Sequence, residues 1–109
     1  MSFMRVASAS TDDGWEIYPI AVDLKIDDGS RRASVNWPLF GAMGKQNTSE
    51  YWPFRMDQNG NIDFGSYGEF RNAWINLLEK EIRKWEICTY RDSPNDRDVV
   101  HRIEEIESL

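Results

Sequence analysis

The stretch SYGEFRNAWINLLEKEIRKW, residues 66–85, decides the expected fold. It opens with Ser66 and Glu69 three residues apart, which is the pattern of a capping box at the start of a helix. Apolar residues then recur every three or four positions, as on one face of an amphipathic helix. They are Phe70, Trp74, Leu77, Leu78, Ile82 and Trp85. The sequence therefore predicts a helix over residues 67–86, long enough to lie along a sheet and cover one of its faces.

The residues before this helix alternate in the way that antiparallel strands do. From Tyr18 to Ile26 every second residue is apolar, and this period of two is typical of a strand with one buried face. Asp28-Gly29 is a hairpin signal, because Asp and Gly both tolerate positive φ. The predicted strands are residues 3–10, 15–26, 31–40 and 51–56, with a loop over residues 41–50.

The stretch MDQNGNID, residues 56–63, contains alternating Asp and Asn residues, as calcium-binding loops do. An EF-hand loop counted from Asp57 needs Gly at its sixth position and Glu at its twelfth, where this chain has Ile62 and Gly68. Asn59-Gly60 is also the commonest signal for a two-residue type I′ hairpin turn. We therefore predict a hairpin at this point and no metal site.

Two further elements are predicted after the long helix. Ile87–Tyr90 is expected to form a short strand. Ser93 and Pro94 have the residue types of a helix cap and a first helical position, and apolar residues from Val99 onward would form the inner stripe of a second helix. A strand from Val99 is the alternative, because the segment is short and begins with β-branched residues. The helix is the preferred interpretation for residues 97–109.

Together these elements predict a single α+β domain over residues 1–109. The domain would contain a four- to five-stranded antiparallel meander, with the long helix packed on one face and a short helix at the C-terminus. A chain of 109 residues has the ordinary size of one domain.

Composition limits the classes of function. The net charge is −6, with 13 Lys and Arg against 19 Asp and Glu. Proteins that bind nucleic acids need clustered cations to displace the counterions of the phosphates, so direct nucleic-acid binding is disfavoured. The single cysteine favours a reducing compartment. The sequence shows no signal-peptide pattern and no apolar run of membrane-spanning length. We expect a cytoplasmic protein without a membrane partner.

Candidate catalytic residues are few. The only histidine, His101, is interpreted as a solvated side chain paired with Glu105, one helical turn away. Cys88 lies in an apolar context, and residues 41–45 lack the spacing of a phosphate-binding loop. The paired carboxylates fall in predicted turns or on polar faces, where no burial raises their pKa for general acid catalysis. We therefore expect neither an enzyme nor a cofactor or metal site.

Acidic residues collect in two regions. Residues 92–109 hold six acids against two bases. Turns 27–30 and 58–61 should lie at the same end of the meander, because alternate hairpins do, and they are expected near the acidic C-terminal segment. Trp15 and Tyr51 fall outside the predicted core faces and are candidate interface anchors. The candidate partner-binding residues are Asp27, Asp28, Asp57, Asp92, Asp96, Asp98, Glu104, Glu105, Trp15 and Tyr51.

Small size, acidic charge and aromatic anchors give the chain a resemblance in style, without a shared motif, to bacterial immunity proteins. That resemblance implies an antitoxin-like inhibitor that binds a basic toxin, such as a nuclease, and occludes its active site. The free protein would be a monomer or a weak dimer. One alternative is a small-molecule-binding or catalytic domain with an aromatic pocket between helix and sheet, and a further one is a structural or adaptor subunit.

Overall fold

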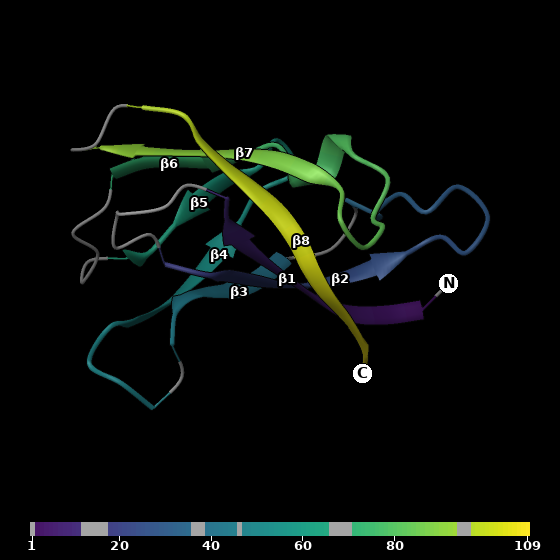
Figure 1. Cartoon of the computed structure of the whole chain (residues 1–109), viewed down its shortest axis with the longest axis horizontal. Helices are drawn as coiled ribbons and strands as arrows, with labels where there is room; N and C mark the ends of the chain where they lie inside the picture. The colour runs from purple at the N-terminus through teal and green to yellow at the C-terminus, as the bar shows by residue number, and fades with distance from the viewer. Residues whose placement is uncertain (1, 12–17, 36–38, 46, 66–70, 94–96) are drawn as a thin grey trace.

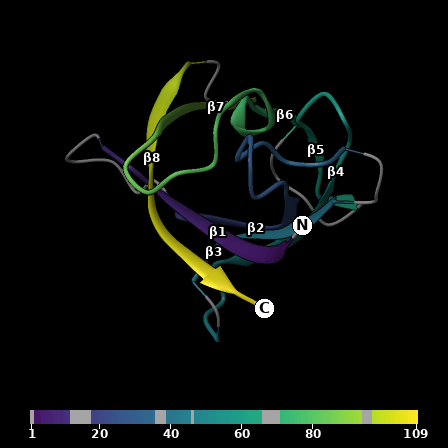
Figure 2. The same cartoon turned by 90° about the vertical axis from the view of Figure 1, so that its right-hand side faces the viewer.

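The computed structural model describes residues 2–11, 18–35, 39–45, 47–65, 71–93 and 97–109. In this part of the chain, eight antiparallel strands close into one barrel (Figures 1 and 2). Each strand pairs with the next one in the sequence, and the last pairs with the first. The predicted α+β fold is therefore wrong. The strands are β1 (Ser2–Ser10), β2 (Ile20–Ile26), β3 (Leu39–Gly44), β4 (Tyr51–Met56), β5 (Asn61–Asp63), β6 (Arg71–Ile75), β7 (Ile87–Ser93) and β8 (Val99–Ser108).

The long helix predicted over residues 67–86 is absent from the described part of that stretch. Strand β6 ends at Ile75, the short 3-10 helix η2 spans Leu77–Glu79, and residues 80–86 form a loop. The capping box at Ser66 lies outside the described residues. Among the described residues no helix is long and apolar enough to cross a membrane. In the described part of the chain the only complete helix is the three-residue η2, so the long helix expected to form a pocket with the sheet is not found there.

The apolar residues of this stretch fit both the period of a helix and the two-residue period of a strand. The structure follows the two-residue period. Ala73, Ile75 and Leu77 are buried at alternate positions. Asn72 has a φ of 50° and Trp85 a φ of 76°, and neither value fits a right-handed helix. Strand β6 pairs with β5 on one side and β7 on the other. These non-local hydrogen bonds override the local preference for helix.

The C-terminal segment is a strand, so the preferred helix is wrong and the alternative is confirmed. Within β8, Val99, His101 and Ile103 are buried at alternate positions. Strand β8 pairs with β7 along one edge and β1 along the other, and this second pairing closes the barrel. The predicted short strand Ile87–Tyr90 is also confirmed, as part of β7.

The N-terminal predictions are correct for three strands and wrong for one. Strands are present within the predicted ranges 3–10, 15–26 and 51–56, although residues 12–17 lie outside the described part. In the described part of the predicted strand over 31–40, residues 31–35 form no strand, and residues 39–40 belong to β3, which continues into the predicted loop as far as Gly44. Gly41 allows this strand to approach β2 closely, since a Cβ there would clash with the carbonyl oxygen of Ala21.

The MDQNGNID stretch forms the predicted hairpin, between β4 and β5. The backbone N–H of Asp57 donates to the Asn61 carbonyl at 2.9 Å, and the N–H of Gly60 donates to the Asp57 carbonyl at 3.1 Å. Gly60 has a φ of 86°, whereas Asn59 is not among the described residues with positive φ. A type I′ turn needs positive φ at both central residues, so the predicted turn type is wrong. The loop is the three-residue kind that ends in a left-handed glycine.

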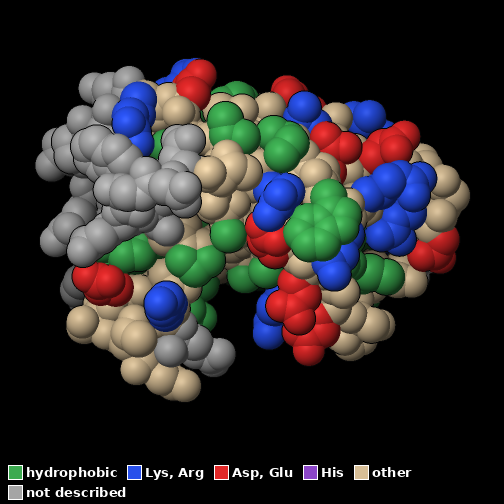
Figure 3. Space-filling model, in the orientation of Figure 1, with side chains coloured by type: hydrophobic (Ala, Val, Ile, Leu, Met, Phe, Trp, Pro, Cys, Tyr) green, Lys and Arg blue, Asp and Glu red, His purple; other side chains and the backbone are tan. Residues whose placement is uncertain are grey.

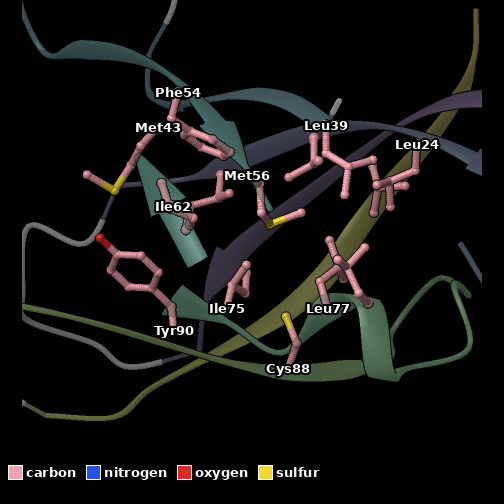
Figure 4. Close-up of a cluster of buried hydrophobic side chains, with 14 of the residues drawn as sticks. Leu24, Leu39, Met43, Phe54, Met56, Ile62, Ile75, Leu77, Cys88 and Tyr90 are labelled. Atoms are coloured by element: carbon pink, nitrogen blue, oxygen red, sulfur yellow. The ribbon is translucent and has the colours of Figure 1, made fainter. Parts of the chain in front are cut away.

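The barrel interior is filled by side chains, as expected for eight strands. Aliphatic, Met and aromatic side chains from opposite walls converge on the axis (Figure 4). Loops 27–35 and 76–86 are hydrogen-bonded to each other at one end of the barrel, called here the η2 end. Leu77, Leu78 and Ile82 of the second loop are buried against the core. This packing makes the outer wall of the barrel a rigid support for surface residues.

Candidate protein-interaction surface

The acidic residues singled out in the sequence lie in different parts of the barrel. Turns 27–30 and 58–61 do lie at one end, the η2 end, since β2 and β4 both finish there. Asp98 lies just before β8 begins, at the opposite end, where β7 finishes. The described carboxylates therefore do not gather into one patch. Asp96 and Trp15 lie outside the described residues.

Several of these carboxylates have local partners. The side chain of Asp57 accepts hydrogen bonds from the backbone N–H groups of Asn59 and Asn61 at 2.8 and 3.0 Å. Hydrogen bonds from Asn61 lower the pKa of Asp57, and those from Ser30 lower the pKa of Asp27. Asp28 is exposed and accepts a hydrogen bond from the Ser2 hydroxyl at 3.1 Å. The turn carboxylates thus stabilise the turns that carry them.

The acids near the C-terminus differ in exposure. Asp92 is 3% exposed and accepts a 2.6 Å hydrogen bond from the Tyr90 hydroxyl, so it points into the barrel. Asp98 is exposed and pairs with Arg91 at 2.6 Å. Glu104 is half-buried and pairs with Arg102 at 2.9 Å. Glu105 is exposed on β8, opposite Ala7 of β1.

The described residues form a groove on the outer wall of β1–β4, with a volume of about 290 Å³. Its floor consists of small residues that lie side by side across neighbouring strands, including Ala21 and Ala42. Phe40 and Tyr51 stand beside this floor and are 57% and 38% exposed. A hollow is visible at the lower edge of the space-filling view, near the connection that follows β3 (Figure 3). We call this the outer groove, defined by Arg5, Ala21, Asp23, Phe40, Ala42 and Tyr51.

The outer groove has a negative border. Arg5 donates two hydrogen bonds to Asp23, at 2.8 and 3.1 Å, and this pairing raises the pKa of Arg5. Glu107 lies opposite Arg5 in the β1–β8 register, and Glu105 lies opposite Ala7. Asp23 lines the groove, and Glu105 and Glu107 lie one strand beyond β1, so this side of the groove holds three carboxylates and the guanidinium of Arg5. On the opposite side, Arg55 lies opposite Phe40 in the β3–β4 register.

Of the predicted site residues, Tyr51 lines this groove and Glu105 borders it. Asp23 and Phe40 were missed. The alternation of the sequence could have identified Asp23, because it lies between the buried Val22 and Leu24 and must therefore point out of the barrel. The neighbours of Phe40 follow from the strand register, which the sequence does not display.

A second group of polar side chains lies inside the barrel. His101 is fully buried, and its Nδ1 lies 3.0 Å from the Ser8 hydroxyl. Its Nε2 has no hydrogen-bond partner among the described residues. Burial lowers the pKa of His101 to about 4, so the ring is neutral at pH 7. The predicted solvated His101 paired with Glu105 is wrong, because the two side chains lie on a strand instead of a helix.

Comparisons of the chain with protein-family models, curated proteins and solved structures found no match.

Proposed function

We propose that this protein is an inhibitor of the immunity or antitoxin kind, which binds a basic partner protein and covers its functional cleft. The outer groove is the surface that fits this role best. The observation that carries the proposal is the position of two exposed aromatic side chains, Phe40 and Tyr51, over a floor of small residues beside Asp23. This arrangement suits a Lys or Arg side chain of the partner.

The chemistry of the groove matches each part of such a side chain. The alkyl stem of a Lys or Arg packs on the small residues of the floor, as such stems commonly do on apolar surfaces. Its charged group lies near an aromatic ring and a carboxylate, and both stabilise a cation. The net charge of −6 attracts a basic protein over longer distances and speeds their encounter.

The support beneath the groove is also suited to tight binding. Strands β1–β4 each carry hydrogen-bonded neighbours on both sides. Their inward residues belong to the packed core. A surface held in this way loses little conformational entropy on binding, so more of the interaction energy appears as affinity.

The test uses the product of the reading frame next to this gene, because an inhibitor of this kind is expected beside its toxin. Calorimetry should give a tight complex that weakens as salt is added. Phe40→Ala and Tyr51→Ala should each weaken binding about tenfold or more, as expected for central anchors. Glu105→Lys should weaken it through charge.

Phe3→Ala is the matched control, since Phe3 is 56% exposed on β1 but does not line the groove. Its binding should stay within about twofold of the wild type. Equal affinities for Phe40→Ala, Tyr51→Ala and Phe3→Ala would remove the outer groove from the proposal. A neighbouring product that does not bind the wild-type protein would remove the inhibitor function itself.

A further inference from the structure

A row of charged side chains crosses the outer wall of the barrel, and Phe40 lies within it. Residues that face each other across neighbouring antiparallel strands point to the same side of the sheet. Each residue of the row is the register partner of the next. The row runs from β8 to β5 through Glu107, Arg5, Asp23, Phe40, Arg55 and Asp63. Arg5 therefore has a carboxylate on either side, one from β8 and one from β2.

Arg5 holds the Asp23 carboxylate, which the proposed partner also needs. Its Nε and Nη2 atoms donate to the two carboxylate oxygens at 2.8 and 3.1 Å, so one guanidinium engages both oxygens. Arg5 and Asp23 line the outer groove together with Phe40 and Tyr51. The free protein thus already has a cation in this groove, supplied by its own chain. A Lys or Arg side chain of the partner has to compete with Arg5 for Asp23.

The pair between Arg5 and Asp23 is exposed enough to exchange. The two side chains are 50% and 38% exposed. Exposed ion pairs contribute little to stability, because water and salt screen the charges. Breaking this pair therefore costs the fold little.

Glu107 offers Arg5 a second position. It is exposed, it lies opposite Arg5 in the β1–β8 register, and its charge attracts the guanidinium. The Glu107 side chain has no hydrogen bond or ion pair of its own within the described ranges. Cβ atoms of facing residues lie about 5 Å apart, so an Arg side chain reaches either neighbour by rotating about its own bonds. Arg5 can therefore leave Asp23 for Glu107 without a movement of the backbone.

We infer that Arg5 closes the outer groove in the free protein and turns to Glu107 when a basic partner binds. The inference rests on the proposed function and deepens it, because it names the residue that regulates access to Asp23. The cation of the partner takes the oxygens that Arg5 leaves, so two ion pairs replace one. Glu107 thereby contributes to binding without touching the partner.

The test is calorimetric titration of the full-length protein with two ligands, the product of the neighbouring reading frame and a peptide of Arg and Gly residues. Arg5→Gln should tighten the binding of both by about two- to fivefold, the range expected when an exposed ion pair no longer competes. Its urea midpoint should stay close to that of the wild type. Arg55→Gln is the matched control, because Arg55 is 68% exposed and lies on the other side of Phe40. It removes the same charge and should tighten binding by a smaller factor.

Glu107→Gln separates the second position of Arg5 from a general effect of charge. It should weaken binding about two- to fivefold in the wild-type background, and much less in the Arg5→Gln background, where no guanidinium has to move. Glu105→Gln, also exposed on β8 but opposite Ala7, should have the same effect in both backgrounds. In NMR spectra the Arg5 Nε–H signal should shift when the peptide is added, and this shift should shrink in Glu107→Gln.

Two results would overturn the inference. One is an Arg5→Gln variant that tightens binding no more than Arg55→Gln does, which would show that only the overall charge matters. The other is an equal effect of Glu107→Gln in the two backgrounds. The proposed function fails on a different result, the absence of binding by the neighbouring product, and the peptide still tests Arg5 in that case. Absence of binding by both ligands would overturn both.

Discussion

His101 couples the protonation of one side chain to the stability of the whole barrel. Its pKa falls from 6.5 to about 4 on folding, because burial disfavours the charged ring. As the pH falls below 6.5, the His101 ring of the unfolded chain takes up a proton, while the buried ring of the folded protein stays neutral until the pH approaches 4. The contribution of His101 to stability is complete above pH 6.5 and is lost as the pH falls towards 4.

We predict that wild-type protein loses about 2–3 kcal/mol of unfolding free energy from this residue between pH 7 and pH 4.5. Urea titrations at the two pH values measure the loss. His101→Asn keeps a polar group near Ser8 but cannot take up the proton, and it serves as the reference, since carboxylates with lowered pKa contribute equally to both proteins. If the two proteins lose the same amount, the coupling does not exist.

At the scale of elements, the η2 end depends on the contact between two loops. The guanidinium of Arg31 donates two hydrogen bonds to the Ile82 carbonyl, at 3.1 and 2.9 Å. The Ile82 N–H donates in turn to the Arg31 carbonyl at 2.6 Å. These bonds hold loop 76–86, with its buried leucines, over the barrel.

We predict that Arg31→Ala lowers the unfolding free energy by about 1–3 kcal/mol, the usual cost of losing hydrogen bonds from a charged group. Arg31→Lys, which keeps the charge but lacks the forked geometry, should recover part of it. Amide hydrogen exchange at Ile82 should accelerate in Arg31→Ala more than exchange in β1 or β2. Uniform acceleration across the barrel would show that the loop contact is not separable from global stability.

The segment over residues 71–85 shows why one element was mispredicted. Its apolar residues satisfy both a helical and a strand period, and the sequence favours the helix through strong helix formers such as Leu77 and Leu78. The structure satisfies the backbone of β6 through β5 and β7 instead. A strand between two neighbours gains hydrogen bonds on both edges, and these bonds cannot be predicted from the spacing of apolar residues within one segment.

At the scale of the whole molecule, closure joins the two ends of the chain. Strand β8 pairs with β1, and the Leu109 N–H donates to the Phe3 carbonyl at 3.1 Å. Without this pairing, β1 and β7 would each present an unpaired edge, which invites aggregation.

We predict that deleting residues 99–109 removes the cooperative thermal transition and makes the protein associate. Circular dichroism and light scattering measure these effects. Changing only Leu109 to Ala, as a control, should leave the transition within a few degrees, because that side chain is 59% exposed. A truncated chain that stays monomeric and melts cooperatively would show that the remaining strands fold without closure.

The sequence alone determined the alternation that buries Ile20, Val22, Leu24 and Ile26, the hairpin after β4, and the place of Tyr51 outside the core. These features depend on neighbours within a few residues. Tertiary structure decided that residues 71–75 and 99–108 are strands, that Phe40 lies beside Asp23, and that Trp85 lies beside Arg102. Each of these depends on hydrogen bonds between distant strands, whose free energy is realised only when the sheet closes into a barrel.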